Sequence, residues 1–293
     1  MNEKELRAFL AVAESGSFTE AGNQMGVTQP AISKRIAGLE ARLNATLFDR
    51  VGKRVFVTAT GRALQAEAGK VLAAIADAQR TLANLTEQPD GTLSLATSHH
   101  IGLHRLAPVL RRLNDAYPTI RLDIRFEDSE DAAELVARGQ VELAIVTLDP
   151  NGQSPLQSRP IWHDPLVFMV APDHPLATRK RVSLATLTEH SAILPGEKTY
   201  TGRIVQKLFA DAGYSLTPTL ATNYLETINM LVGTGLGWSM LPKTMTGELR
   251  ALYFATAVER QLGLITNPQR TASNAAKSFS EILLSFGDAD LLR

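Results

Sequence analysis

Cysteine is absent from the sequence, which excludes disulfide bonds from any account of its stability. Long hydrophobic runs are also absent, since no stretch reaches the roughly 18 apolar residues that a membrane-spanning helix requires. The opening residues, Met1–Arg7, contain no apolar stretch of the kind found in secretory signals. We therefore expect a cytoplasmic protein with no membrane partner.

The chain carries no net charge, because 30 basic residues balance 30 acidic ones. A global field that steers the molecule to nucleic acid is therefore absent, and DNA binding would depend on a local patch. Residues 28–54 contain six basic side chains against two acidic ones, a local net charge of +4. This cluster either neutralises DNA phosphates or forms an ordinary solvated surface, and the surrounding motif decides between the two.

The chain of 293 residues is long enough for two or three domains. Signals typical of helices dominate its first part. Apolar residues at helical intervals predict a first helix that ends before Gly16. Ser17 and Glu20 have the spacing of a capping box, which predicts the start of a second helix. Gly26 suits a left-handed turn after that helix.

A third helix is predicted to begin at Thr28, which is placed to cap it, and to tolerate Pro30 in its first turn. Its buried stripe is expected to comprise Ile32, Ile36, Leu39 and Leu43. Polar and basic side chains remain for the outward face, namely Gln29, Ser33, Lys34 and Arg35. Together with Thr28 and Pro30 at the helix start, these are the residues of this helix expected to contact DNA. Gln pairs well with adenine, and Lys and Arg pair with guanine, so this face suits base readout in the major groove.

Residues 50–58 predict a short strand, a turn at Gly52 and a second strand. Such a hairpin is either a plain connection between helices or a wing that touches DNA. As a wing, it would present Arg50, Lys53 and Arg54 to phosphates or to the minor groove.

Together these features resemble the LysR-type transcriptional regulators, most specifically over about the first 65 residues and, beyond these, more loosely in domain order and length. The residues that carry the resemblance are Leu6, Phe9, Ala13, Gly16–Phe18, Ala21, Thr28–Ser33, Ile36, Leu39, Glu40, Leu47, Phe48, Arg50 and Thr58–Gly61. The resemblance implies that Gln29, Ser33 and Lys34 lie at the major groove and that Lys53 approaches the minor groove. It also implies double-stranded promoter DNA, a small-molecule inducer, RNA polymerase and further copies of the chain as partners, in a homodimer or homotetramer, with no cofactor.

Residues 60–86 lack proline and predict one long helix. Apolar residues recur in alternating steps of four and three, at Leu64, Ala68, Val71, Ile75, Ala78, Leu82 and Leu85. A heptad seam of this kind either packs on its own domain or pairs two chains. The resemblance implies a dimer. A dimer would place the third helices of the two chains, which are expected to contact DNA bases, about one turn of DNA apart.

From Thr92 onward, short apolar strands alternate with helices, which predicts parallel sheets with right-handed crossovers. One of the helices is expected to run without interruption to Tyr117. The fold class is thus a multidomain α plus α/β protein, with a winged helix-turn-helix over 1–59, a linker helix over 60–88 and an effector-binding domain over 89–293. The resemblance implies that the effector-binding domain has two lobes and is similar to periplasmic binding proteins. Its first lobe is expected to comprise residues 92–160 and 267–293, and its second lobe residues 161–266.

Ligands of open α/β sheets lie at the carboxyl ends of strands. The effector-binding residues expected on this basis are Ser98, His99, His100, Ser129, Thr147, Pro195, Thr201 and Asn223. Because helix N-termini favour carboxylates, we expect a small anionic metabolite. Glu127 and Asp128 form an acidic corner that either disfavours an anion or pairs with Arg121 or Arg125.

Histidines follow the first of these strands. His99 and His100 could orient a carboxylate and make affinity depend on pH, or His99 could simply begin a helix. His100 and His104 have a metal-chelating spacing, but no carboxylate or cysteine stands beside them in the sequence, so no metal site is expected.

Enzyme motifs are not predicted. The glycines of 233–237 follow a helix and precede a strand, which is the reverse of a dinucleotide fingerprint, and residues 237–241 fail the nucleophile-elbow pattern. The sequence therefore predicts a ligand-responsive regulator that binds specific DNA. Its alternatives are an architectural DNA-binding protein that needs no ligand, and a solute-binding protein.

Overall fold

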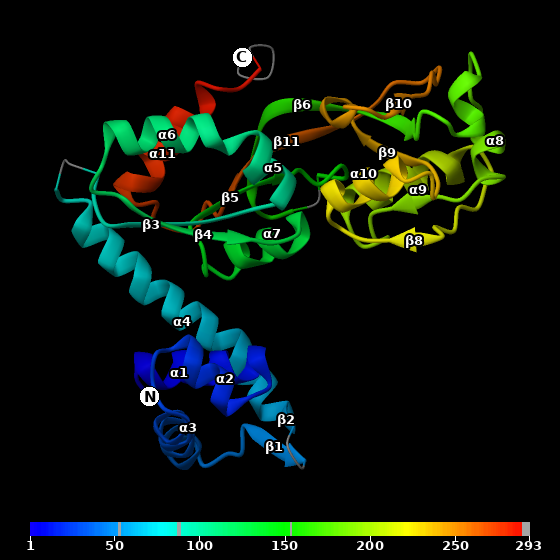
Figure 1. The fold of residues 1–293 in the computed structure, drawn as a ribbon. Coiled ribbons are helices and arrows are strands. Elements are labelled where there is room, and N and C mark those ends of the chain that lie inside the picture. Colours follow the sequence, from blue (N-terminus) through cyan, green and yellow to red (C-terminus); the bar gives the residue numbers. More distant parts are fainter. Residues whose placement is uncertain (52–53, 87–88, 153, 289–293) are drawn as a thin grey trace. The chain divides into compact units, whose positions relative to one another are not determined.

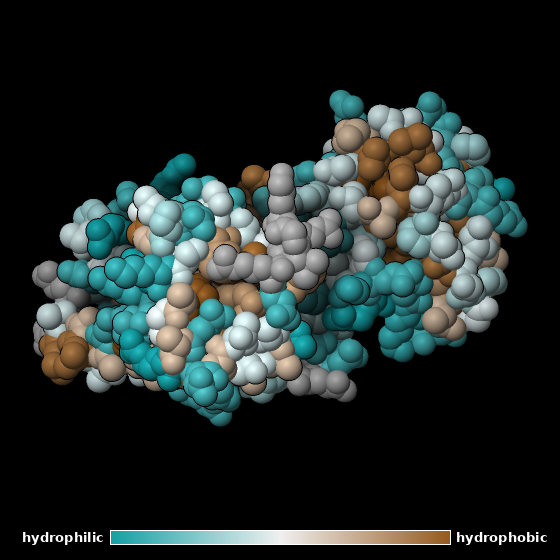
Figure 2. Space-filling view, turned by 90° about the horizontal axis from the view of Figure 1, so that it is seen from below, coloured by the Kyte–Doolittle hydropathy of each residue, from teal (hydrophilic) through white to brown (hydrophobic). Residues whose placement is uncertain are grey.

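The computed structural model describes residues 1–293 except 52–53, 87–88, 153 and 289–293. The chain divides into two compact units, Met1–Leu85 with Arg138–Gln140, and Thr86–Ala137 with Val141–Arg293. Within the described part of the chain, no helix is both long and apolar enough to cross a bilayer. Figure 2 shows one face, on which hydrophilic residues surround smaller groups of hydrophobic ones.

The first unit is a set of helices with one two-stranded hairpin (Figure 1). Its elements are α1 (Glu3–Ser15), α2 (Phe18–Gln24), α3 (Gln29–Leu43), β1 (Phe48–Val51), β2 (Arg54–Val57) and α4 (Ala59–Ala83). Strands β1 and β2 pair in antiparallel fashion, with Phe48 opposite Val57. The predicted helix-turn-helix, hairpin and long helix are thus all observed.

The first two helix starts are capped by side chains. Asn2 and Glu5 form a reciprocal capping box at α1 that the sequence analysis did not predict. At α2, the Ser17 hydroxyl accepts from the Glu20 N–H as predicted. The reciprocal half of the box is absent there, because the Ser17 N–H donates to the Ser15 hydroxyl at 3.3 Å.

Thr28 stands at the N-cap position of α3, but its side chain makes no capping hydrogen bond. The prediction of a Thr28 side-chain cap was therefore wrong. The side-chain oxygen of an N-cap residue normally accepts from the backbone N–H two or three residues later, and here neither donor is free. Pro30 has no N–H, and the Ala31 N–H donates to the Thr28 carbonyl oxygen at 3.0 Å. This arrangement leaves the Thr28 hydroxyl on the exposed side of the helix start.

The apolar face of α3 packs into the core of the first unit. Ile32, Ile36 and Leu39 are buried there together with Phe9 and Phe18. Leu43, which was predicted to complete this stripe, is instead 39% exposed. It is the last residue of α3, and the chain turns away directly after it through Asn44, whose φ of 48° is left-handed.

The apolar seam of α4 is divided between two environments. Leu64 and Ala68 pack into the core of the first unit, so this part of the seam serves its own domain. Val71 is 38% exposed and Leu82 68%. Leu85, 79% exposed, was predicted to lie on this helix but falls in the turn after it, because α4 ends at Ala83. The later part of the seam therefore presents apolar side chains to solvent in the single chain.

The second unit contains a first lobe built on three parallel strands. Strand β3 (Thr92–Thr97) lies between β4 (Arg121–Phe126) and β5 (Leu143–Thr147). Its helices are α5 (His99–His104), α6 (Leu106–Ala116), α7 (Ser129–Ala137) and α11 (Asn274–Leu284). The helix predicted to run without interruption to Tyr117 is in fact broken at Arg105, which ends α5 and precedes α6.

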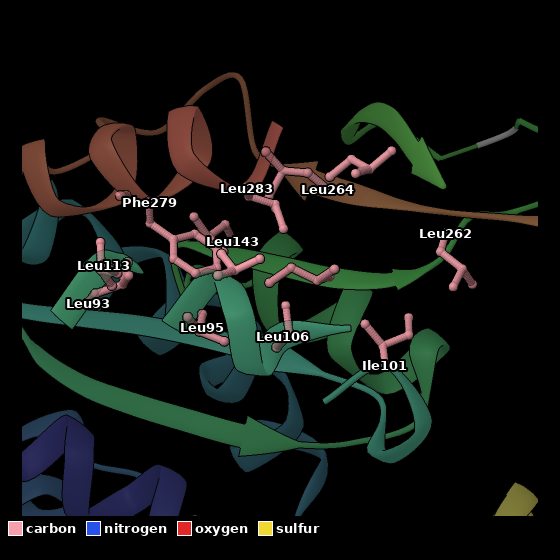
Figure 3. Packing of buried hydrophobic residues seen from close by; sticks show 14 of the residues in the cluster. Leu93, Leu95, Ile101, Leu106, Leu113, Leu143, Leu262, Leu264, Phe279 and Leu283 are labelled. Atoms are coloured by element: carbon pink, nitrogen blue, oxygen red, sulfur yellow. The ribbon is translucent and has the colours of Figure 1, made fainter. Parts of the chain in front are cut away.

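Leucines from strands and helices far apart in the sequence form the core of this lobe. Figure 3 shows Phe279 and Leu283 of α11 beside Leu143 of β5 and near Leu93 and Leu95 of β3. The last helix of the chain therefore completes the core begun by the strands that follow residue 91.

Two long strands run between the lobes (Figure 1). They are β6 (Gln157–Val170) and β11 (Val258–Thr266), which pair in antiparallel fashion. Strand β11 also pairs antiparallel with β5. The sheet is therefore mixed, with β3, β4 and β5 parallel as predicted, because β6 leaves the first lobe and β11 returns to it in the opposite direction.

The second lobe contains a smaller set of elements around Trp238 and Phe209, which are stacked in its core. In chain order they are η1 (Pro175–Thr178), α8 (Leu184–Thr188), β7 (Ile193–Leu194), α9 (Tyr200–Asp211), β8 (Leu220–Ala221), α10 (Leu225–Gly233), β9 (Ser239–Pro242), η2 (Lys243–Met245) and β10 (Arg250–Ala251). Strands β7 and β8 are parallel, whereas β9 and β10 pair antiparallel with β6.

Candidate nucleic-acid interface and ligand cavity

The outward face of α3 holds the side chains predicted to read DNA. Exposed positions at its start and along this face are Thr28, Gln29, Pro30 and Lys34, and half-buried ones are Ser33 and Arg35. Because the opposite face is anchored by buried Ile32, Ile36 and Leu39, this set is held on a rigid element. Its residues belong to the first two turns, the part of a recognition helix that reaches base edges.

Gln29 and Ser33 are linked to each other. The Gln29 Nε2 donates to the Ser33 Oγ at 2.8 Å, one turn along the helix. This hydrogen bond restricts the conformations of both side chains, while the side-chain Oε1 of Gln29 stays available as an acceptor. The two residues therefore present a partly ordered pair of polar groups to any duplex at this face.

Not every charge in the basic cluster of 28–54 is available to phosphate. Arg42 pairs with the buried carboxylate of Glu5 at 3.1 Å. Glu40 accepts from the Leu47 N–H at 2.7 Å, which ties the end of α3 to the chain leading into β1. Both residues therefore have structural partners within the first unit.

The hairpin contains the remaining predicted contacts. Arg50 of β1 pairs with Val55, and Arg54 of β2 pairs with Val51 in the strand register. Lys53 and Gly52, the predicted turn residue, lie outside the described residues.

A cavity in the second unit gathers the predicted effector-binding residues. All eight of them, Ser98, His99, His100, Ser129, Thr147, Pro195, Thr201 and Asn223, line it. The other lining residues are Asp128, Glu130, Thr199, Tyr200, Tyr224, Leu225 and Arg260. Its empty space, counted out to the open mouth and including solvent there, is about 500 Å³.

The cavity lies where strands of both lobes end. Strand β3 leads into Ser98, β5 ends at Thr147, and β7 is followed by Pro195. Ligands bind at such carboxyl ends because loops and helix starts converge there. The topology therefore explains why residues more than 100 positions apart line the same space.

Arg260, which the sequence analysis did not identify, lines the cavity from β11. Its side chain is buried; Nε donates to Asp164 at 2.8 Å and Nη1 donates to the Thr201 hydroxyl at 2.7 Å. Across the part of the chain that the structure describes, Nη2 has no hydrogen-bond partner. Strand β11 is apolar from Leu262 onward, so the sequence signal that was missed is an arginine at the start of an apolar run.

Two carboxylates of the first lobe reach across to the second. Glu130 accepts from the Tyr200 N–H at the start of α9 and lies 3.7 Å from Arg203. Asp128 accepts from the amide of Asn223. Neither predicted alternative for Asp128, repulsion of an anion or pairing with Arg121 or Arg125, anticipated this contact. These hydrogen bonds hold the lobes together at the cavity.

Burial changes the acid–base behaviour of the cavity. Desolvation raises the pKa of Glu130 above its ordinary value, although hydrogen bonds to backbone N–H groups oppose that change. Desolvation, assisted by the positive charge of Arg260, lowers the pKa of His100 to about 4. His100 is therefore neutral at pH 7, so a charge on this residue does not assist binding of an anion.

The other histidines have distinct surroundings. His99 contacts two aromatic rings, with centroid distances of 5.1 Å to Phe126 and 5.0 Å to Tyr224. His104 is exposed on α5 and approaches Glu226 of α10 at 3.1 Å, a contact across the lobes that the sequence analysis missed.

Comparison with known proteins assigns both units. Residues 4–62 match the model of the bacterial regulatory helix-turn-helix protein, lysR family, and residues 86–287 match the LysR substrate binding domain. An uncharacterized HTH-type transcriptional regulator in the ibpB-leuC intergenic region of Azotobacter vinelandii is 55% identical over 108 residues, which cover 37% of this chain and 75% of that protein.

Solved structures share the fold. CbnR complexed with its target DNA is 20% identical, with a TM-score of 0.67 over 98% of this chain and 100% of that one. The effector binding domain of QuiR in complex with shikimate is 19% identical, with a TM-score of 0.61 over 68% of this chain and 97% of that one.

Proposed function

The chain belongs to the LysR family of DNA-binding transcriptional regulators, and on that premise we propose that it reads an operator with α3 and senses a small carboxylate in the cavity of its second unit. The proposed arrangement comprises a DNA-binding domain over 1–59, a linker helix over 60–88 and an effector-binding domain over 89–293. The proposed lobe boundaries, near 160 and 266, fall within β6 and at the end of β11.

The proposal for DNA rests on the outward face of α3. Gln29 and Ser33 supply hydrogen-bonding groups for base edges, and Lys34 and Arg35 supply positive charge. The hairpin residues Arg50, Lys53 and Arg54 are proposed to contact the backbone of the same duplex. The cocrystal of CbnR with its target DNA shows that a chain of this fold binds a duplex.

Dimerisation is proposed through the exposed part of the α4 seam. Val71 and Leu82 of α4 are large apolar side chains of the heptad seam that the single chain leaves in water. Pairing of this helix with a second copy would bury them and bring two α3 helices to one operator. A homotetramer is proposed as a dimer of such dimers, and RNA polymerase at the promoter, in the cytoplasm, as the partner on which the regulator acts.

The single observation that carries the effector proposal is the free Nη2 of Arg260. This buried arginine lines the cavity and uses Nε on Asp164 and Nη1 on Thr201, whereas its third nitrogen, Nη2, has no acceptor among the described residues. Arginine is suited to carboxylates because its planar donors match carboxylate oxygens. Shikimate, the ligand of the QuiR domain, is itself a small carboxylate.

Glu130 supports a mechanism for the response. Its carboxylate lies on the Tyr200 N–H at the start of α9, a position that favours negative charge. An effector carboxylate held by Arg260 competes with Glu130 for this end of the cavity and changes how the two lobes are joined. The effector alters DNA binding only through its different affinities for the two arrangements, typically by about 1–3 kcal/mol.

Calorimetric titration with a panel of small aliphatic and aromatic carboxylates tests the proposal, with the matching neutral amides as control ligands. We expect a carboxylate, but not its amide, to bind. Arg260→Lys keeps a cation beside Asp164 but removes the planar donor set, and should weaken binding by about 10- to 100-fold, or about 1.4–2.7 kcal/mol. Arg111→Gln, at an exposed position, is the control.

Footprinting on promoter DNA then separates the functions. A footprint that changes when the carboxylate is added supports a metabolite-responsive regulator. An unchanged footprint would favour an architectural DNA-binding protein, and ligand binding without any specific footprint would favour a solute-binding protein. Equal binding of carboxylates and amides would contradict the role of Arg260.

A further inference from the structure

Three potential metal ligands meet across the two lobes, beside the cavity. His100 and His104 belong to α5 of the first lobe, and Glu226 belongs to the first turn of α10 of the second lobe. One nitrogen of each histidine and a carboxylate oxygen of Glu226 all lie within 4.8 Å of one another. The sequence alone showed only the two histidines, because the carboxylate comes from a position more than 120 residues away.

The donor set suits a divalent transition metal. Two imidazole nitrogens and one carboxylate oxygen are ligands that Zn²⁺ accepts, and the softer first-row cations use the same set. Residues four apart lie on one face of a helix, and the His100 and His104 rings are accordingly 4.7 Å apart. Helix α5 therefore presents both nitrogens to a single point.

The distances leave room for an ion with small side-chain rotations. Glu226 Oε1 lies 3.3 Å from His100 Nδ1 and 3.1 Å from His104 Nε2. Two ligands of a tetrahedral zinc ion, each about 2.0–2.1 Å from the metal, are about 3.3 Å apart. The oxygen–nitrogen separations are thus already close to those of a coordinated ion.

We propose that His100, His104 and Glu226 bind a divalent transition-metal ion, represented by Zn²⁺, which ties the first lobe to the second. In the absence of metal, the same groups form hydrogen bonds from both imidazoles to Glu226. Metal replaces these weak contacts by coordination bonds, and a fourth position remains for water. Arg260 adds an opposing positive charge nearby, which Asp164 offsets by its 2.8 Å contact with the guanidinium.

The binding test uses the full-length protein, with any polyhistidine tag removed. Zn²⁺ is titrated in competition with a chromogenic chelator, and one ion per chain is expected. His104→Asn and Glu226→Gln each remove one ligand and should weaken binding by at least about tenfold, since loss of an outer-shell partner alone costs 10- to 100-fold. His104 is exposed, so its replacement spares the core.

His190→Asn is the matched control. His190 lies beside His174, with rings 5.2 Å apart, and so tests whether any close pair of histidines accounts for the binding. This variant should retain the affinity of the wild type. Equal losses in His190→Asn and His104→Asn, or no saturable binding in the wild type, would overturn the proposal.

Hydrogen exchange tests the link between the lobes. Zn²⁺ should slow amide exchange in both α5 and α10 of the wild type, and in neither helix of Glu226→Gln. Protection confined to α5 would show that the ion sits on the histidines alone and does not join the lobes. Because this assay uses neither DNA nor a carboxylate, its outcome is independent of the effector proposal.

Discussion

Substitution of Gly22 by alanine probes how closely the two helices of the DNA-binding motif approach. A Cβ at Gly22 would lie 2.8 Å from the Val27 carbonyl oxygen and 3.3 Å from the Gln29 N atom, both of them backbone atoms. Backbone can move aside only by shifting the turn that sets the start of α3. Overpacking of this kind costs about 1–3 kcal/mol.

A helical glycine also carries an intrinsic penalty that alanine removes, about 1 kcal/mol. The two effects oppose each other in Gly22→Ala, and the expected net loss is about 1 kcal/mol. For a domain of this size, such a loss lowers the melting temperature by about 4–8 °C. Gly38 in α3 supplies the control, because a Cβ there would meet only a side-chain oxygen of Glu5 at 3.9 Å.

Differential scanning calorimetry of the full chain measures the transition of the first unit. Gly22→Ala should lower its midpoint and Gly38→Ala should raise it. Binding to a specific operator should weaken in Gly22→Ala, because the start of α3 is displaced. An increase in melting temperature for both variants would refute the steric reasoning.

Further tests address both units. Ser33→Ala should cost about 1–3 kcal/mol of specific binding and relax base preference; an equal loss on random duplex would argue against base readout. Removing Lys53 should flatten the salt dependence of binding by roughly one unit, as log affinity against log salt shows. Asp at both Val71 and Ile75 should disrupt dimers in ultracentrifugation, because pairing would bury unpaired charges, and unchanged dimers would place the interface elsewhere. The raised pKa of Glu130 means that folding favours its protonated form, so this contribution to stability is present below the ordinary glutamate pKa of 4.5 and is lost as pH rises through the folded pKa. Glu130→Gln should therefore melt higher than the wild type at pH 7, and this difference should vanish at pH 4; a constant difference would contradict the shift.

Local patterns predicted most elements of the chain. The helices of the first unit follow from apolar spacing and from helix-start residues such as Ser17, which depend on neighbours within a few positions. The parallel strands β3, β4 and β5 follow from apolar runs that alternate with helices. The eight predicted cavity residues meet because strand ends converge wherever this topology occurs.

Sequence predictions were wrong where a residue fits a local pattern but the tertiary structure gives it different surroundings. Thr28 has the right residue type for a cap, but Pro30 removes one donor and Ala31 uses the other on the Thr28 carbonyl oxygen. Leu43 continues the apolar period of α3, yet the helix ends at that residue and the side chain reaches solvent. Periodicity alone does not show where a helix stops contributing to a core.

The order of the domains, the outward face of α3 and the strand ends that line the cavity could all be predicted from the amino-acid sequence, because each depends on residues close together in the chain. Which distant groups meet depends on the folded chain. Arg260 reaches Thr201, Asp128 reaches Asn223, and Glu226 reaches His104 because β6 and β11 carry the chain from one lobe to the other and back. No local spacing records such contacts, since the separation along the chain is unrelated to the distance across the cavity.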